Sequence, residues 1–179
     1  CARATLEAKA SLEPGQVSLY VGVPFCPTRC AYCSFISADV GRALKLVPPY
    51  VDALCREIAA AGEGLRRGGK KVRTFYMGGG TPTTLDAGQL DRVLTALEEH
   101  IGLDACTEHT VEAGRPDTIT AGKLAVLRAH GCGRISVNPQ SMEEKVLRAI
   151  GRSHTPEDIL RAWELVRAAG FPYVNMDLI

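Results

Sequence analysis

The sequence lacks a long apolar run, an excess of charge of one sign and any low-complexity segment. None of its hydrophobic stretches approaches the roughly 20 residues that a membrane-spanning helix needs, and the N-terminus has no hydrophobic segment typical of a signal peptide. A net charge of +1 gives no electrostatic argument for nucleic acid or an acidic membrane surface as a partner. The 179 residues, 46% hydrophobic and 23% charged, therefore predict one globular domain without a membrane span.

The sequence also lacks the even number of cysteines that is typical of a scaffold held by disulfides. There are seven cysteines, an odd number, and three of them are clustered within one short stretch. This usage favours a reducing compartment, and we expect a cytoplasmic protein. The isolated Cys55, Cys106 and Cys132 are expected to be buried or incidental thiols.

The clustered cysteines are the most informative feature of the chain. Cys26, Cys30 and Cys33 stand at C-x3-C-x2-C spacing directly after an apolar run over residues 17–23 that predicts a buried strand. Thiolates suit iron–sulfur clusters or zinc. A structural zinc ion is bound by four ligands, and no fourth His or Cys is nearby in the sequence. A [4Fe–4S] cluster held by three cysteines instead leaves one iron open to bind another ligand. A zinc site with a distant fourth ligand, or a disulfide with one spare thiol, remains an alternative from the spacing alone.

Strands and helices alternate along the rest of the sequence. Apolar runs predict strands over residues 17–23, 72–77, 109–113, 134–138 and 173–179, with helices between them. This alternation predicts βαβ units and a parallel α/β sheet, either open and doubly wound or curled into a barrel. Two helix starts carry a capping-box pattern, Asp86 with Gln89 and Ser141 with Glu144. Glycines at 62, 64, 68 and 69 are expected to end the first helix.

A glycine-rich segment, Gly78 to Thr83, follows the second predicted strand. Three glycines in a row let a backbone approach a ligand closely and expose its peptide groups. A dinucleotide-binding fingerprint fails here because Thr83 occupies the position of the last glycine in G-x-G-x-x-G. A plain tight turn stays open as an alternative.

Taken in order, these motifs resemble those of the radical S-adenosylmethionine superfamily, and within it the oxygen-independent coproporphyrinogen III oxidase (dehydrogenase) family. The resemblance covers roughly residues 17–179. Besides the cysteine and glycine segments, it rests on Tyr20 six residues before Cys26 and on the segments 110–113, 137–142, 150–154 and 175–179. Residues 112–117 and 136–140 look most like the HemZ-type branch of that family.

The resemblance implies a fold and a division of the chain. It implies a partial (β/α)6 barrel, with the chemistry on loops at the carboxyl ends of the strands. Both ends of the sequence look cut, because residue 1 is Cys rather than Met and the last residues predict a buried strand. We therefore expect a linker or tail of an upstream region over residues 1–16 and an incomplete barrel over 17–179, truncated in its fifth strand.

The resemblance also implies site residues. Cys26, Cys30 and Cys33 would bind the cluster, and no further catalytic residue is assigned. Contacts to one or two S-adenosylmethionine molecules would come from Tyr20, Tyr32, Gly79, Gly80, Thr81, Glu112, Gln140, Arg152 and Asp177. Glu112 and Asp177 can accept hydrogen bonds from ribose hydroxyls or an ammonium group, and Arg152 can bind a carboxylate through two hydrogen bonds. Considered alone, Asp177 also fits a strand-end carboxylate and Arg152 a charge at a helix C-terminus.

Two further residues lie beside these positions in the sequence. Arg115 closely follows Glu112 at a strand end, where a guanidinium can hold a substrate propionate. A surface arginine is the favoured interpretation of Arg115. His154 follows Arg152 by two residues and can face the same site.

The function implied by the resemblance is that of a radical S-adenosylmethionine oxidoreductase of porphyrin and haem biosynthesis. It would decarboxylate propionate side chains of coproporphyrinogen III oxidatively to vinyl groups, with an electron donor such as flavodoxin or ferredoxin. The alternative is a haem chaperone on the same scaffold. A zinc-bound structural or nucleic-acid module is a third possibility, which leaves Gln140, Arg152 and Asp177 unexplained.

Overall fold

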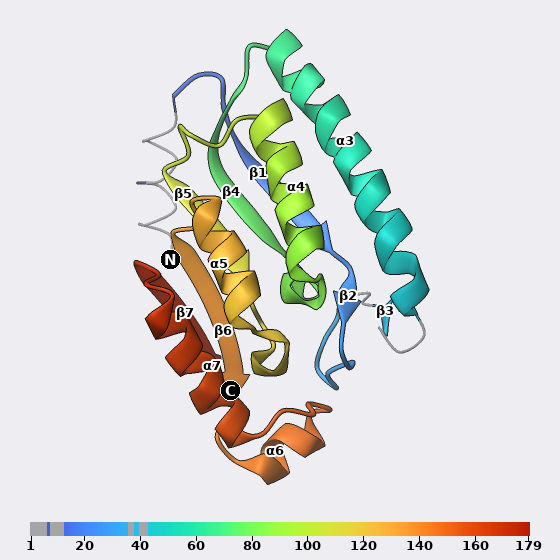
Figure 1. The fold of residues 1–179 in the computed structure, drawn as a ribbon, viewed down its shortest axis with the longest axis vertical. Helices are drawn as coiled ribbons and strands as arrows, with labels where there is room; N and C mark the ends of the chain where they lie inside the picture. The colour runs from blue at the N-terminus through green and yellow to red at the C-terminus, as the bar shows by residue number, and fades with distance from the viewer. Residues whose placement is uncertain (1–6, 8–12, 36–37, 40–42) are drawn as a thin grey trace.

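The computed structural model describes residue 7 and residues 13–35, 38–39 and 43–179. Most of the tail predicted over residues 1–16 lies outside the described residues. The five predicted strands are confirmed and form one parallel sheet in the order β1-β4-β5-β6-β7 (Figure 1). These strands are β1 (Gln16–Val23), β4 (Lys71–Gly79), β5 (Glu108–Glu112), β6 (Arg134–Gln140) and β7 (Tyr173–Leu178). The predicted burial of the last strand is wrong, because β7 pairs only with β6 and its side chains are mostly exposed, as at Tyr173 and Leu178.

The order of the strands in the sheet follows their order in the sequence, which distinguishes a barrel-like sheet from an open doubly wound one. In a doubly wound sheet the strand order reverses at a switch point, whereas here every crossover leads to the next strand along. The result is an unclosed, curved parallel sheet, consistent with the predicted partial barrel. A second, two-stranded sheet pairs β2 (Phe25–Cys26) with β3 (Ala38–Asp39) beside the end of β1.

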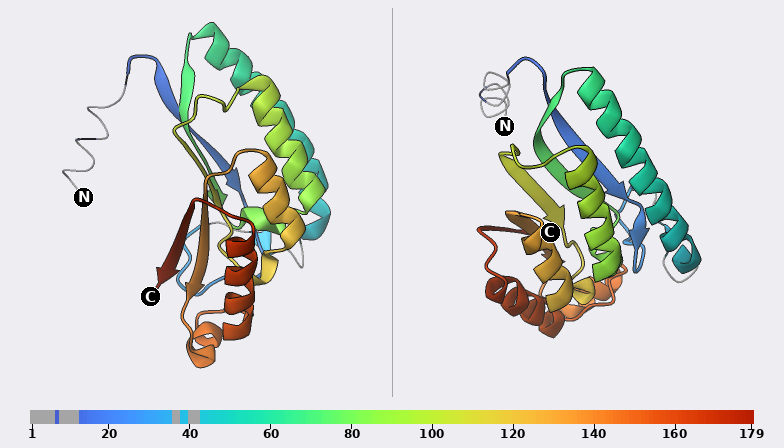
Figure 2. Two further views of the ribbon diagram at one scale, coloured as in Figure 1. Left: turned by 60° about the vertical axis from the view of Figure 1, so that its left-hand side comes forward. Right: turned by 45° about the horizontal axis from the view of Figure 1, so that its top comes forward.

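The main helices cover one face of the large sheet (Figure 2). They are α3 (Val47–Arg67), α4 (Ala87–His100), α5 (Ala121–Ala129) and α7 (Pro156–Ala168), and the short α6 (Glu144–Ala149) precedes α7. Among the described residues, no helix is long and apolar enough to cross a membrane.

Alternation along each strand separates an apolar face from a polar one. Val21, Phe75, Met77, Val111 and Ile135 belong to the core cluster shared with the helices. The residues between them point to the other face, because successive strand side chains alternate. The polar side chains on that second face come from four strands: Ser18, Tyr20, Thr74, Tyr76, Thr110, Glu112, Ser136 and Asn138.

The first helix is longer than its glycines predict. α3 runs through Gly62 and Gly64 and ends only at Arg67, so only Gly68 and Gly69 follow its end. Gly62 is needed inside the helix because a Cβ there would lie 2.2 Å from the carbonyl oxygen of His100 on α4. A close helix–helix contact, which sequence periodicity does not reveal, explains this glycine.

The two predicted capping boxes have different outcomes. Asp86 caps α4 and forms the predicted box with Gln89. The box between Ser141 and Glu144 is wrong, because α6 begins only at Glu144 and its N-cap is Glu143, without a side-chain cap. Ser141 instead accepts a hydrogen bond from the Glu143 amide at 3.1 Å, a local turn contact that competes with a helix start.

Candidate active site

The loops at the carboxyl ends of the strands surround a cavity of about 400 Å³. The structure brings together there all three clustered cysteines and eight of the nine predicted cofactor contacts. Those eight are Tyr32, Gly79, Gly80, Thr81, Glu112, Gln140, Arg152 and Asp177. Parallel strands end at one edge of a sheet, which explains why residues so far apart in sequence meet there.

Tyr20 is the one predicted contact that does not line this cavity. It lies on the polar sheet face, 59% exposed, with its ring stacked on Tyr76 at a centroid distance of 6.0 Å. Tyr76 in turn donates a hydrogen bond to Glu112, which does line the cavity. The role of Tyr20 stays a prediction.

The cysteine loop is anchored to the segment that follows α6. The Ala31 amide donates to the Ile150 carbonyl at 2.9 Å, and the Thr28 hydroxyl donates to the Gly151 carbonyl at 2.7 Å. Gly151 has φ +80°, and a Cβ there would lie 2.7 Å from the Arg29 carbonyl oxygen. Glycine is therefore required at 151 both for its backbone angle and for the close approach of the cysteine loop.

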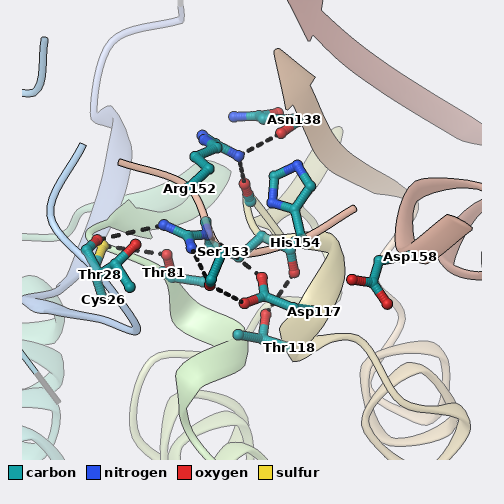
Figure 3. Close-up of polar contacts among 12 residues, drawn as sticks. Cys26, Thr28, Thr81, Asp117, Thr118, Asn138, Arg152, Ser153, His154 and Asp158 are labelled. Carbon is teal, nitrogen blue, oxygen red and sulfur yellow. Dashed lines mark hydrogen bonds and ion pairs between the residues drawn. The ribbon is translucent and has the colours of Figure 1, made fainter. Parts of the chain in front are cut away.

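The three clustered cysteines are partly buried free thiols. The Cys26 sulfur lies 3.3 Å from the Thr81 hydroxyl (Figure 3). The Cys30 sulfur accepts a hydrogen bond from the Arg115 guanidinium at 3.8 Å. Within the described part of the chain, no three His, Cys, Asp or Glu side chains converge closely enough to hold one metal ion.

Glycine is required at each of positions 78, 79 and 80, for a different structural reason at each. A Cβ on Gly78 would lie 2.9 Å from a Glu112 carboxylate oxygen, and one on Gly80 would lie 2.6 Å from the Phe25 carbonyl oxygen. Gly79 has φ +104°, which favours glycine. The Gly80 and Thr81 amides donate to Val23 and Phe25 carbonyls, both at 2.7 Å. Those two amide hydrogens are therefore not available to a ligand.

Glu112 provides a half-buried carboxyl group in the cavity wall. Burial raises its pKa; the hydrogen bond from Tyr76 lowers it, and the charge of Asp177 raises it further. The two acidic residues are thus close enough to influence each other. A cationic group bound between them would relieve their repulsion and favour the ionised form of both.

Arg152 is buried, with 7% of its surface exposed, and its orientation is fixed. Its Nη1 donates to the carbonyls of Gly114 and Asn138 at 3.0 and 2.6 Å (Figure 3). Its Nη2 reaches the Tyr32 hydroxyl at 3.3 Å, while its buried Nε has no protein partner. Nε and Nη2 form one edge of the guanidinium, the geometry that binds a carboxylate through two hydrogen bonds.

Gln140 holds an unusual backbone conformation. It is buried and has φ +68°, the only described residue other than glycine with a positive φ. The preceding Pro139 carbonyl is held by His154 Nε2 at 3.2 Å, and the Gln140 carbonyl accepts a bond from the Ile179 amide at 3.0 Å. Strain of this kind persists where the surroundings fix it, commonly at ligand-binding sites.

The predictions for Arg115 and His154 need correction or refinement. Arg115 is not a surface residue: only 2% of it is exposed, although it borders the cavity, and each of its nitrogen atoms contacts a protein group. Its role in holding a propionate stays a prediction. His154 is also buried and supports the Pro139 carbonyl from behind rather than lining the cavity. Neither burial was visible in the sequence, since both residues lie in polar loops.

Asn138 is a cavity-lining residue that the sequence analysis did not single out. Its side-chain Oδ1 is buried without a protein partner, although it borders the cavity. Its position at the end of β6, within the segment 137–142 already marked as a motif, was the available signal. An unpartnered buried acceptor at a cavity wall is what a ligand donor would satisfy.

Comparison with protein families gives one match that spans most of the chain. Residues 20–179 match the model of the Radical SAM superfamily. The chain is 44% identical over 165 residues to the oxygen-independent coproporphyrinogen-III oxidase-like protein HemZ of Bacillus subtilis, covering 92% of this chain and 33% of that protein. It is 36% identical over 162 residues to the heme chaperone HemW of Lactococcus lactis, covering 90% and 40% respectively.

A solved structure shares both sequence and fold with the chain. Coproporphyrinogen III oxidase (HemN) from Escherichia coli superimposes with a TM-score of 0.81 at 33% identity, covering 98% of this chain and 40% of that one. The chain thus spans between a third and two-fifths of the length of these relatives. The names of these relatives describe an oxidase of coproporphyrinogen III, an oxidase-like protein and a haem chaperone.

Proposed function

Because the chain belongs to the radical SAM superfamily, we propose that Cys26, Cys30 and Cys33 bind a [4Fe–4S] cluster whose open iron takes S-adenosylmethionine. The observation that carries this proposal is that the three thiols line the same cavity as Glu112, Arg152 and the other predicted contacts. When bound, the reduced cluster and S-adenosylmethionine together supply hydrogen-atom abstraction.

The donors and acceptors of the cavity fit such a cofactor. Its ammonium group needs acceptors, which the Glu112 carboxylate and the carbonyls of Gly79 and Gly80 provide. Its carboxylate needs donors, which the unpartnered Arg152 Nε and the adjacent Nη2 provide. Asp177 and the buried Asn138 Oδ1 can accept hydrogen bonds from ribose hydroxyls. Whether one or two cofactor molecules bind is left to measurement.

The protein's own residues would orient the cofactor and limit the access of water. Arg152 is locked by two carbonyls and a tyrosine hydroxyl, so it binds a carboxylate without first losing rotamer freedom. Tyr32 stands at the cavity edge, where its ring can pack beside the cluster and the adenine. Gln140 also lines the cavity, with its backbone held at a positive φ.

For the whole protein we propose oxidative decarboxylation of coproporphyrinogen III, as in an oxygen-independent coproporphyrinogen III dehydrogenase. Each reacting propionate loses one hydrogen atom, which ends on 5′-deoxyadenosine, then CO2 and one electron, and a vinyl group remains. That electron would pass to an external one-electron acceptor. The similarity to HemZ and HemN supports this substrate. A flavodoxin or ferredoxin as electron donor and a cytoplasmic location remain predictions of the same proposal.

The second candidate is a haem chaperone, and the similarity to HemW favours it. A chaperone would bind haem and pass it to other proteins without changing the tetrapyrrole. The cavity residues do not discriminate between the two roles, because both would use the same cluster and cofactor site.

One experiment separates the two candidates. The full-length protein is reconstituted with iron and sulfide without oxygen and given a reductant, S-adenosylmethionine and coproporphyrinogen III. The dehydrogenase predicts 5′-deoxyadenosine together with tetrapyrroles lighter by one and two CO2 units, and predicts that Cys30→Ala abolishes both. Cofactor cleavage without any tetrapyrrole product rejects this substrate, and tight haem binding without either product favours the chaperone.

A further inference from the structure

Arg115 is a buried cation at the base of the cysteine loop. It lies between β5 and the short helix η3 (Pro116–Thr118), and 2% of its surface is exposed. Its Nη1 donates to the Thr28 carbonyl at 3.3 Å and to the Cys30 sulfur at 3.8 Å. Its Nη2 donates to the Ser153 hydroxyl at 3.3 Å.

The guanidinium joins three loops that are distant in sequence. Its own loop follows β5, Thr28 and Cys30 belong to the cysteine loop, and Ser153 lies between α6 and α7. Asp117 completes the arrangement, because it accepts from Arg115 Nε at 3.4 Å and from the Ser153 hydroxyl at 3.3 Å. Figure 3 shows Thr28, Asp117 and Ser153 gathered at this point, beside Cys26 and Arg152.

A guanidinium with only 2% of its surface exposed needs partners for its positive charge. Burying an ion is costly unless it is paired and hydrogen-bonded. Asp117 supplies one carboxylate on the Nε side, whereas the opposite side of Arg115 faces the Cys30 sulfur. A neutral thiol is only a weak acceptor, but a thiolate held on iron carries negative charge and accepts a charge-assisted hydrogen bond. The placement of Arg115 is therefore explained by a ligated Cys30.

From this geometry we infer that Arg115 is a positioning residue that holds the Cys30 ligand and favours the reduced state of the cluster. The inference rests on the proposed cluster. A [4Fe–4S] cluster with three thiolates is anionic and becomes more negative when it takes an electron. A hydrogen bond to a ligand sulfur and a fixed positive charge beside it both stabilise the more negative state.

The loop has other anchors, so substitution of Arg115 need not detach it. The bonds Ala31–Ile150 and Thr28–Gly151 hold the loop independently of the guanidinium. Arg115→Gln removes the charge and Arg115→Lys keeps it without the planar fork. Arg148→Gln is the matched control, because Arg148 is an exposed arginine of α6 paired with Glu144. Its side chain makes no hydrogen bond or ion pair with the described residues of the cysteine loop.

The test uses the full-length protein, reconstituted without oxygen and without S-adenosylmethionine. Iron and sulfide content, circular dichroism and the ratio of reduced to oxidised cluster at one fixed potential are measured, the last by electron paramagnetic resonance. Since the guanidinium stabilises the more negative reduced cluster more than the oxidised one, we expect Arg115→Gln to lower that ratio severalfold. Arg115→Lys should give an intermediate ratio, and Arg148→Gln the wild-type one.

The outcomes are distinguishable. Equal ratios in wild type, Arg115→Lys and Arg115→Gln, with full iron content, overturn the inference and leave the cluster proposal intact. If Arg115→Gln does not fold, a ratio in Arg115→Lys equal to that of wild type also overturns it. Wild-type protein that holds no iron–sulfur cluster refutes the proposed function itself.

Discussion

The Thr81 hydroxyl lies 3.3 Å from the Cys26 sulfur, although 55 positions separate the two residues. The contact continues a backbone pairing in which Gly80 and Thr81 donate to Val23 and Phe25. The glycine-rich segment and the cysteine loop are therefore one structural unit. A substitution in one segment should therefore perturb the structure of the other.

The first prediction concerns that unit. Gly80→Ala would place a Cβ 2.6 Å from the Phe25 carbonyl oxygen, and a backbone atom cannot move aside as a flexible side chain can. We expect a loss of about 1–3 kcal/mol in the free energy of unfolding and a lower iron content after reconstitution. Urea unfolding and iron analysis test it. Wild-type values in both would show that the two segments are not coupled.

A second prediction uses two glycines of one helix. Gly62→Ala would bring a Cβ 2.2 Å from the His100 carbonyl oxygen and should destabilise the protein by about 1–3 kcal/mol. Gly64→Ala, on the exposed side of α3 with nothing within 4 Å of the added Cβ, should stabilise it by about 0.5–1 kcal/mol. Thermal unfolding of both variants gives the comparison, and equal effects would contradict the packing of α3 on α4.

Glu112 should show opposite effects on stability and on binding. Burial raises the pKa of this carboxyl group, so the folded protein disfavours its ionised form. The neutral Glu112→Gln can still accept from Tyr76, and we expect its melting temperature to equal or exceed that of wild type. Binding of S-adenosylmethionine should weaken roughly tenfold or more, because the ammonium group loses a charged acceptor.

Equilibrium dialysis with the reconstituted protein measures this change in affinity. Tyr76→Phe removes only the hydroxyl that donates to Glu112, so it should weaken cofactor binding less than Glu112→Gln does. Unchanged affinity in Glu112→Gln would remove Glu112 from the proposed site.

His130 makes stability depend on pH in a defined direction. Burial lowers its pKa, but the hydrogen bonds and charges of Asp91 and Glu98 outweigh burial and raise it. Because the folded pKa lies above the unfolded value near 6.5, the stabilisation is fully present below about pH 6.5 and is lost as pH rises through the folded value.

The corresponding measurement is urea unfolding of wild type and His130→Asn across this pH range. The stability difference between them should be largest below pH ~6.5 and shrink toward higher pH. Asp91→Asn, which removes one of the two partners, should reproduce part of the effect. A difference that grows with pH would have the wrong sign for this account.

The sequence predicted the strands and the common location of the site residues because both follow from local patterns. Apolar runs mark buried strands, and the ends of parallel strands converge whatever the details of packing. Long-range contacts were not predictable in this way. The burial of Arg115, the need for Gly62 against His100 and the positive φ of Gln140 depend on segments more than 30 residues away or on tertiary restraint.

The capping error at Ser141 has a local cause. The pattern of Ser141 and Glu144 is correct for a helix that starts immediately after the serine, but α6 starts later. The serine hydroxyl then bonds to the Glu143 amide instead. Sequence patterns fix helix existence better than helix boundaries.

The most direct test of the account is electron paramagnetic resonance of the full-length protein, reconstituted and reduced without oxygen, before and after addition of S-adenosylmethionine. The account predicts the spectrum of a reduced [4Fe–4S] cluster that changes when the cofactor is added, and no such spectrum in Cys30→Ala. Purified protein that holds zinc instead of iron, or a cluster spectrum unaffected by saturating S-adenosylmethionine, would contradict it.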